Sequence, residues 1–426
     1  MPHSLLFISP RRALLFCLML SLFELLVYVG SDIVMPGMLT VVADLNADVL
    51  YVPWSMNAYL LGGVALQWII GPLSDRFGRR PLILIGCAGF AFACVTTPWV
   101  ASIEQFMALR FVQGIGLGFV IAVSYPAIQE SFSESDSVRL FAIFSTIGLL
   151  SPLLGPMLGT ALLSLMTWQV LFLVFSVVCA LVWLGLFYAM PETIGVTRKD
   201  GSRLEPQPLR VGDILRTYGG LLHNRRFMAG TLALGLAGLP LLAWIALSPV
   251  LLMHNLNASA TEYALWQLPV FGAMIIGNVV LNCTIGRFGI ERLLAMSLLP
   301  LFGGLALALI ATLLINHIVA LISGLALYAF GLGICNATLY RLTLFSSQSG
   351  KGAVAAMLGM IPVGLFALGI SLLAALGAGD GLADYIAAAA APAFLALLPT
   401  LYVLDRALAD RARDEAQGAQ AGDQPC

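Results

Sequence analysis

Twelve long apolar stretches follow one another along this chain, and they constrain its fold more than any other feature of the sequence. A helix needs about 20 mainly apolar residues to cross the hydrocarbon core of a bilayer. Inside lipid every backbone N–H and C=O group must be bonded within the protein, so such stretches are expected to be helical. The predicted spans are residues 14–38, 52–74, 81–100, 103–128, 138–164, 168–190, 227–252, 262–286, 292–315, 317–341, 352–377 and 381–404.

The composition excludes a soluble domain. Of the 426 residues, 60% are hydrophobic and 10% are charged, whereas soluble domains carry about 25% charged residues. The net charge of −1 gives no reason to expect a nucleic-acid partner. The seven cysteines have no paired spacing, so we expect neither a disulfide framework nor a metal site, and no cofactor. The first stretch is too long for a cleavable signal peptide and is expected to stay as a span.

Basic residues occupy alternate connections between the spans. All 21 Lys and Arg residues except Arg110 fall on one side, whereas the opposite connections contain only acids, among them Asp44, Asp48, Glu262, Asp380 and Asp384. The positive-inside rule makes the basic side cytoplasmic. We therefore expect an all-α membrane protein with 12 transmembrane helices and both termini in the cytoplasm.

The longest hydrophilic stretch divides the spans into six and six. The residues Arg76-Phe77-Gly78 after the second span recur as Arg287-Phe288-Gly289 after the eighth. We expect an N-terminal six-helix bundle (1–192), a cytoplasmic linker (193–226), a C-terminal six-helix bundle (227–406) and a cytoplasmic tail (407–426). Two such repeats are typical of transporters that bind substrate between their halves.

Two carboxylates interrupt the first span. A charge at membrane depth costs several kcal/mol, so an ionisable residue there is a functional hypothesis by default. Glu24 lies roughly 15 Å into the span, and Asp32 follows about 12 Å further along. Pro36 and Gly37 are expected to loosen the helix just beyond Asp32. A carboxyl group that exchanges its proton for a cationic cargo is the minimum machinery of an antiporter.

Arg110 is the basic residue inside a span, at about the depth of Asp32. A buried guanidinium must be paired or hydrogen-bonded, and Asp32 is the nearest candidate by depth. In the alternative interpretation Glu24 or Asp32 only pairs with Arg110 to hold helices together. One Arg cannot pair with both acids, however, so one carboxyl group would remain unpaired. Glu130, at the cytoplasmic end of its span, is expected to need no partner.

A cavity of broad specificity would offer aromatic faces and pliable Met side chains. The candidates by helix and depth are Tyr28, Met56, Tyr59, Tyr125, Trp244 and Trp266. Ordinary packing or a lipid-facing position is an equally good explanation for any one of them. Trp54 and Trp168 lie near span ends and are interpreted as interfacial anchors.

Three motifs resemble those of the 12-span drug/proton antiporters of the major facilitator superfamily. They are Gly71-Pro72-Leu73-Ser74-Asp75-Arg76-Phe77-Gly78-Arg79-Arg80, Arg110-Phe111-Val112-Gln113-Gly114, and the run from Gly148 to Gly159 that contains Gly155 and Pro156. The resemblance implies that Glu24 and Asp32 serve substrate and proton and that Arg110 assists. It also implies gating roles for Gly71, Asp75, Arg76, Arg79, Gly155 and Pro156. Ser31 stands where that subgroup often has Asn.

The sequence therefore predicts a proton-coupled multidrug efflux antiporter of the inner membrane that works by alternating access. The expected partners are lipophilic cationic and neutral drugs, protons and the lipid bilayer, and the chain is expected to be a monomer. A proton-coupled transporter of one small metabolite or of a monovalent cation remains the alternative. An enzyme is not expected, because no His-Glu-x-x-His or phosphate-binding loop is present.

Overall fold

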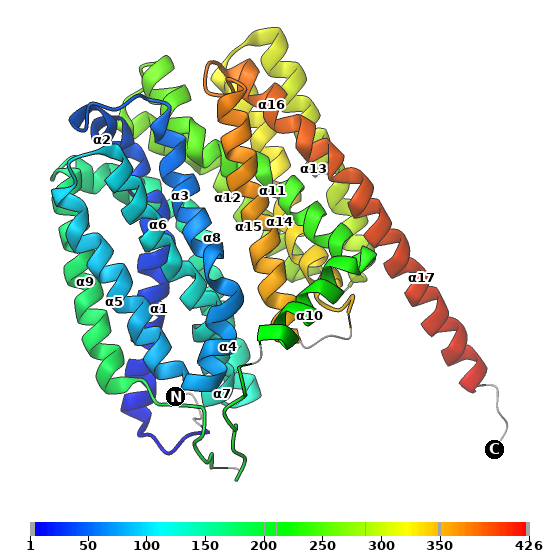
Figure 1. Ribbon diagram of the computed structural model, residues 1–426. Coiled ribbons are helices and arrows are strands. Elements are labelled where there is room, and N and C mark those ends of the chain that lie inside the picture. Colours follow the sequence, from blue (N-terminus) through cyan, green and yellow to red (C-terminus); the bar gives the residue numbers. More distant parts are fainter. Residues whose placement is uncertain (1–4, 200, 210, 286, 348–350, 423–426) are drawn as a thin grey trace. The chain divides into compact units, whose positions relative to one another are not determined.

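A computed structural model describes residues 5–199, 201–209, 211–285, 287–347 and 351–422, and its regular elements there are helices (Figure 1). The first half contains α1 (Pro10–Asp32), η1 (Met35–Gly37), α2 (Met38–Asp44), α3 (Tyr51–Ala65), α4 (Gln67–Phe77), α5 (Arg79–Thr96), η2 (Thr97–Trp99), α6 (Ile103–Phe119), η3 (Val120–Ser124), α7 (Tyr125–Ser131), α8 (Glu134–Leu163) and α9 (Trp168–Ala189). The second half contains α10 (Val211–His223), α11 (Arg225–Ser248), η4 (Pro249–Asn255), α12 (Ala260–Thr284), α13 (Ile290–Ile315), α14 (Ile318–Leu344), α15 (Lys351–Ala375), α16 (Leu382–Leu395) and α17 (Leu397–Gly422).

The expected helical spans are present as helices. Within the described residues, ten helices are long and apolar enough to cross a membrane, and the pair α3 and α4 makes an eleventh span that is bent by 41°. The stretch expected at 138–164 falls in α8, whose described apolar part is Leu150–Leu163. The helical fold class is therefore confirmed, and the count of twelve spans stays a prediction.

The described chain divides into two compact units. The first consists of residues 1–211, 243–268 and 366–375, and the second consists of residues 212–242, 269–365 and 376–426. The first unit thus includes the end of α11, the start of α12 and the end of α15 as well as the predicted N-terminal bundle. Within it, Asn57 Nδ2 donates to Ser371 Oγ at 2.9 Å and Thr160 Oγ1 donates to Ala260 O at 3.2 Å.

In the first unit α1 packs against α8 and α9, and α3 packs closely against α6. The approach of α3 to α6 depends on a missing side chain at Gly114, where a Cβ atom would lie 1.9 Å from the carbonyl oxygen of Tyr59. Small residues at such crossings let two backbones come together inside a membrane. The close crossing places Arg110, one turn before Gly114, among the polar side chains of α3.

The first and fourth spans are irregular at the polar residues. The α-helix of the first span ends at Asp32, and a 3₁₀ turn over Met35–Gly37 follows, as Pro36 and Gly37 predicted. The fourth span changes from α6 to the π-helical segment η3 before α7 begins at Tyr125. Such wide turns inside helices frequently occur at functional sites, because they rotate the side chains that follow.

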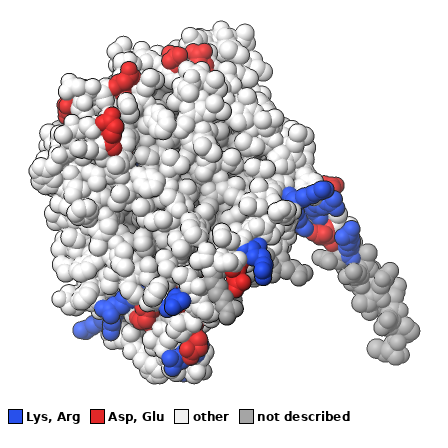
Figure 2. Space-filling model, in the orientation of Figure 1, with Lys and Arg blue, Asp and Glu red and all other residues white. Residues whose placement is uncertain are grey.

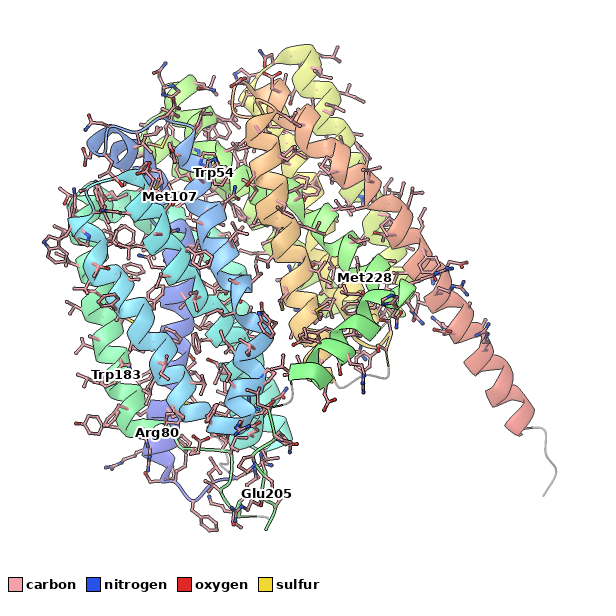
Figure 3. The ribbon with its side chains drawn as sticks, in the orientation of Figure 1. Trp54, Arg80, Met107, Trp183, Glu205 and Met228 are labelled. Atoms are coloured by element: carbon pink, nitrogen blue, oxygen red, sulfur yellow. The ribbon has the colours of Figure 1, made fainter. Side chains whose placement is uncertain are left out.

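Charge separates the two ends of the first unit. One end, called the acidic end here, carries Asp44, Asp48, Glu104 and Glu262, and the other, the basic end, carries Arg76, Arg79 and Arg80. On the face shown in Figure 2, the charges visible at the upper end of the first unit are acidic, and the Lys and Arg residues visible on this unit lie toward its lower end. Figure 3 shows Trp54 toward the acidic end of this unit, and Arg80 and Trp183 toward the basic end.

The second unit is held by tyrosines that bond to the backbone of α11. Tyr328 OH donates to Ala237 O at 2.5 Å and Tyr385 OH donates to Pro240 O at 2.6 Å. Both tyrosines are fully buried. The two bonds therefore satisfy hydroxyl groups that would find no hydrogen-bond partner in lipid or in an apolar core.

Candidate functional site

The Asp32 carboxylate is enclosed at the end of α1. The residue is 2% exposed, Ser31 Oγ donates to Oδ1 at 2.8 Å, and Ser151 Oγ on α8 donates to Oδ2 at 3.3 Å. The helix α8 can come this close because position 155 is glycine: a Cβ atom there would lie 2.6 Å from the Asp32 Cβ. Hydroxyl donors stabilise a buried carboxylate without neutralising it. The motif residue Gly155 therefore shapes the pocket of the acid.

Arg110 does not pair with Asp32, contrary to what depth suggested. Its guanidinium, fully buried, donates to the carbonyl oxygens of Gly30 at 2.9 Å and Ser31 at 2.7 Å, and among the described residues no carboxylate forms an ion pair with it. Further bonds go to Ser55 Oγ at 3.1 Å and Gln113 Oε1 at 3.0 Å.

The physical reason for that correction is the end of α1. The last four carbonyl groups of a helix have no partner within the helix, and a cation near them is favourable. Because α1 stops at Asp32, the carbonyls of Gly30 and Ser31 are free to accept from Arg110. The guanidinium also lies 4.6 Å from the centre of the Tyr59 ring, a cation–π distance.

Glu24 is the more isolated acid. It is fully buried, and Tyr125 OH donates to its Oε1 at 2.9 Å. Its Oε2 has no hydrogen-bond partner among the described residues. An unpaired buried carboxylate oxygen is costly, so a proton or a cationic ligand stabilises this group. The π-helical segment η3 precedes Tyr125 directly and thereby sets the position of its ring.

The remaining predicted cavity residues lie on α1 itself and on other helices of the first unit. Ser31 Oγ lies 2.7 Å from Tyr28 O and 2.8 Å from Asp32 Oδ1, so its single hydroxyl hydrogen is shared between these two acceptors. The ring of Tyr28 faces Gly148 of α8, where an added Cβ would be 3.6 Å from Tyr28 Cζ. Met56 on α3 is 3% exposed. Whether these side chains contact substrate stays a prediction.

Tyr59 and Trp244 both belong to the first unit, and both side chains are buried. Tyr59 OH donates to Val27 O at 2.5 Å, which ties α3 to α1. Trp244 belongs to a separate network of hydrogen bonds. Its Nε1 donates to Gln267 Oε1 at 2.7 Å, and Gln267 Nε2 donates to Ser248 Oγ at 3.3 Å. Trp244 thus belongs to the same unit as the two acids although it lies in the second half of the sequence. Trp266 beside this network is half-buried.

At the basic end the motif residues form a charge cluster. Arg79, 6% exposed, forms ion pairs with Asp75 and with Glu130, the latter at 2.8 Å between Nη2 and Oε1. Its Nη1 also donates to Ser74 Oγ. Arg76 instead lies over the Phe77 ring at 5.4 Å, and position 71 has open space around it. Asp75 on α4 and Arg79 on α5 therefore form an ion pair between two helices, and the gating roles of these residues stay a prediction.

Two further acids of this cluster were missed by the sequence analysis. Glu130 was expected to need no partner, yet it holds Arg79 and accepts from Thr193 Oγ1 at 2.5 Å. Glu192 accepts from the backbone N–H groups of Arg79 at 2.9 Å and Arg80 at 3.2 Å at the start of α5. A carboxylate at a helix N-terminus satisfies unpaired N–H groups and complements the helix dipole. In the sequence, Glu192 is only an isolated acid after the sixth span, and this pattern is too common to indicate a role.

Of the two tryptophans interpreted as interfacial anchors, one is not at the surface. Trp54 is 45% exposed, as an anchor should be, but Trp168 is 3% exposed and its Nε1 donates to Asp44 Oδ2 at 2.8 Å. Its ring meets those of Phe106 and Phe172 edge to face at 5.8 and 6.5 Å between centroids. A buried indole needs a partner for its N–H group, and Asp44 supplies one.

Known proteins agree with this fold and these motifs. A family model, "Major Facilitator Superfamily", matches residues 20–378, and the chain belongs to that superfamily. It is 49% identical over 363 residues to the "Multidrug transporter MdfA" of Yersinia pestis bv. Antiqua (strain Angola), covering 85% of this chain and 87% of that protein. The protein of the same name from Escherichia coli O6:H1 is 44% identical over 375 residues, with 87% of this chain and 90% of that protein covered.

Solved structures with low sequence identity share the fold. A bacterial homologue of the human lysosomal transporter Spinster, inward-facing and unoccupied, has a TM-score of 0.70 at 15% identity, covering 95% of this chain and 99% of that one. A D-xylose–proton symporter has a TM-score of 0.68 at 16% identity, covering 91% of this chain and 97% of that one. Both are transporters, and at these identities the likeness concerns the fold alone.

Proposed function

We propose that this chain is a multidrug efflux transporter of the bacterial inner membrane that exchanges lipophilic cationic and neutral compounds for protons. The observation that carries the proposal is the buried Glu24, whose Oε2 has no partner among the described residues. Identities of 44–49% to multidrug transporters over most of the chain support the substrate class. In the proposed topology twelve spans cross the membrane as two six-helix bundles, and the basic end and both termini face the cytoplasm.

The proposed coupling uses the two acids of α1. A proton on Glu24 or Asp32 is displaced when a cationic cargo loads from the cytoplasmic side, and it returns when cargo leaves on the outer side. Arg110 fixes the end of the helix that carries Asp32, because it bonds to Gly30 O and Ser31 O. Alternating access by movement of the two halves then exposes the acids to each side in turn. Each charge moved with the membrane potential supplies about 2.3 kcal/mol per 100 mV.

We assign the recognition of many different substrates to side chains of α1 and of other helices in the first unit. Tyr28, Ser31, Met56, Tyr59, Tyr125 and Trp244 are proposed to line the route, with Glu24 and Asp32 as the charged contacts. Aromatic faces attract cations, and a Met side chain adapts to irregular ligands. The charge cluster of Asp75, Arg79 and Glu130 is proposed to hold the basic end closed in one state and to break in the other.

Drug-dependent proton release from purified protein in weakly buffered detergent solution tests this function. We expect release on adding a lipophilic cation to the wild type, reduced release in Glu24→Gln or Asp32→Asn, and none in the double variant. Glu104→Gln is the matched control, because it removes an exposed carboxylate from the first unit. Normal proton release by the double variant would contradict the proposal. Proton release in response to only one class of metabolite would favour a specific transporter instead.

A further inference from the structure

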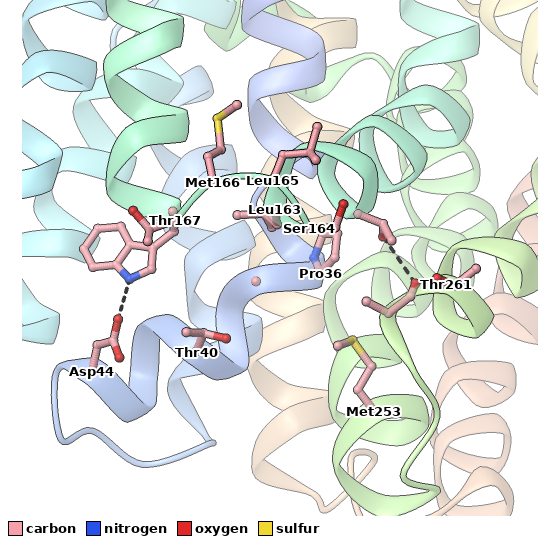
Figure 4. Close-up of a pocket in the computed structure, with 14 residues that line it drawn as sticks. Pro36, Thr40, Asp44, Leu163, Ser164, Leu165, Met166, Thr167, Met253 and Thr261 are labelled. Atoms are coloured by element: carbon pink, nitrogen blue, oxygen red, sulfur yellow. Dashed lines mark hydrogen bonds between the residues drawn. The ribbon is translucent and has the colours of Figure 1, made fainter.

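A pocket of about 600 Å³ lies at the acidic end of the first unit (Figure 4). It is formed where the end of the first span, the connection from α8 to α9, and the segment from η4 to α12 meet. The hydrogen bond from Thr160 Oγ1 to Ala260 O ties two of these segments together. Pockets of roughly 300–1,000 Å³ accommodate drug-sized ligands, so this one has the capacity for a compound of the proposed class.

The pocket contains a single charge. Asp44 is the one charged residue that lines it, and among the described residues no Lys or Arg forms an ion pair with this carboxylate. Its Oδ2 accepts from Trp168 Nε1 at 2.8 Å, shown as a dashed line in Figure 4. The indole is a neutral donor, so it fixes the carboxylate in position and leaves the negative charge uncompensated.

The rest of the lining is mostly apolar. Leu163, Leu165, Met166 and Met253 contribute side chains, and two of these are thioethers that adapt to irregular shapes. Asp44, Thr40 and Leu165 are exposed, so the pocket is open to solvent, whereas Glu24 is 0% exposed and Asp32 is 2% exposed. A monovalent organic cation with apolar substituents matches one fixed carboxylate in an apolar wall. An anion or a small hydrated ion does not.

We infer that this pocket is a second binding site for lipophilic monocations, separate from the Glu24 and Asp32 site. Its neighbours at the same end of the first unit, Asp48, Glu104 and Glu262, are also acidic, which raises the local concentration of cations. A role in receiving cargo on its way out rests on the proposed function, because that function makes the acidic end the outer one. Binding itself does not depend on transport.

The test uses full-length protein in lipid nanodiscs and tetraphenylphosphonium as the probe. The Glu24→Gln/Asp32→Asn double variant removes the charged groups of the buried site, so that equilibrium binding reports the pocket. We expect one saturable site in this background, weakened at least about tenfold by adding Asp44→Asn. Asparagine keeps an oxygen for Trp168, so the substitution removes charge with little change of geometry. Raising NaCl from about 50 to about 500 mM should also weaken this binding, because the carboxylate is exposed.

The matched control is Asp48→Asn, which removes one charge from the same connection but does not line the pocket. It should change the affinity less than about twofold. A second variant, Thr40→Trp, fills the exposed rim and should abolish binding while Asp44 stays, which keeps the test valid if Asp44→Asn folds poorly. Absence of a saturable site in the double variant, or equal effects of Asp44→Asn and Asp48→Asn, would overturn the inference. Failure of the proposed export would appear separately, as absent proton release in the wild type.

Discussion

Arg110 Nη2 donates to the carbonyl oxygen of Ser31 at 2.7 Å, so the guanidinium holds the backbone next to Asp32 and not its carboxylate. The arrangement keeps Asp32 Oδ1 and Oδ2 on hydroxyl donors from Ser31 and Ser151. A direct ion pair would compete with a cationic substrate for the acid. The observed geometry leaves the charge of Asp32 available while the cation stabilises the helix end.

We first predict that Arg110→Lys lowers the thermal stability of the purified protein. Lys has three donors on a flexible stem, and it cannot reproduce the planar fork that reaches Ser55, Gln113 and two carbonyls at once. The loss of at least one buried bond to a charged donor costs roughly 1.5–3 kcal/mol. Thermal unfolding in detergent should show a decrease of several degrees. Arg216→Lys on the exposed surface of α10 is the control and should have no measurable effect.

Gly155→Ala should destabilise the contact between α1 and α8. Its Cβ would lie 2.6 Å from the Asp32 Cβ, so either the acid or the helix must move. Overpacking of this kind typically costs about 1–3 kcal/mol, and displacement of Asp32 should also weaken drug binding. The same substitution at Gly89 on α5 meets open space and should be neutral or slightly stabilising. Thermal unfolding and binding, measured on both variants, check the prediction; equal behaviour would contradict it.

Glu192→Ala should destabilise the basic end. The carboxylate accepts the N–H groups of Arg79 and Arg80 at the start of α5, a role comparable to that of a capping residue. Loss of a cap costs about 0.5–2 kcal/mol, and Glu192→Gln should lose only part of this, because one oxygen remains. Glu205→Ala removes only a surface ion pair with Arg203 and should change stability by less than about 0.5 kcal/mol. Thermal unfolding distinguishes the three variants.

Drug binding to the buried site should weaken as pH falls. When one cation displaces one proton from a carboxyl group, mass action raises the apparent Kd by at most about tenfold for each pH unit of acidification. The measurement is tetraphenylphosphonium affinity between about pH 8 and pH 6, made on Asp44→Asn protein so that the buried site is reported. Thermal unfolding of the same protein over the same pH range is the control for general pH effects on the fold. A cation affinity independent of pH would contradict the exchange.

The sequence alone determined the helical class and the unusual residues of the first unit. Apolar stretches long enough to span a bilayer leave the backbone no alternative to a helix, so their existence could be predicted without tertiary information. The same argument marked Glu24, Asp32 and Arg110, because a charge at that depth is expensive wherever the neighbouring helices lie. Pro36 and Gly37 fixed the end of the first helix locally.

Tertiary structure decided which partner each of these groups has. Arg110 bonds to helix-end carbonyls, Glu130 and Glu192 meet Arg79, and Trp168 turns inward to Asp44, none of which depth or spacing predicted. These pairings join residues far apart in the sequence, and they depend on how closely helices approach, which glycines such as Gly114 and Gly155 control. The cost of burying a charge follows from the residue itself, whereas the group that compensates it follows from packing.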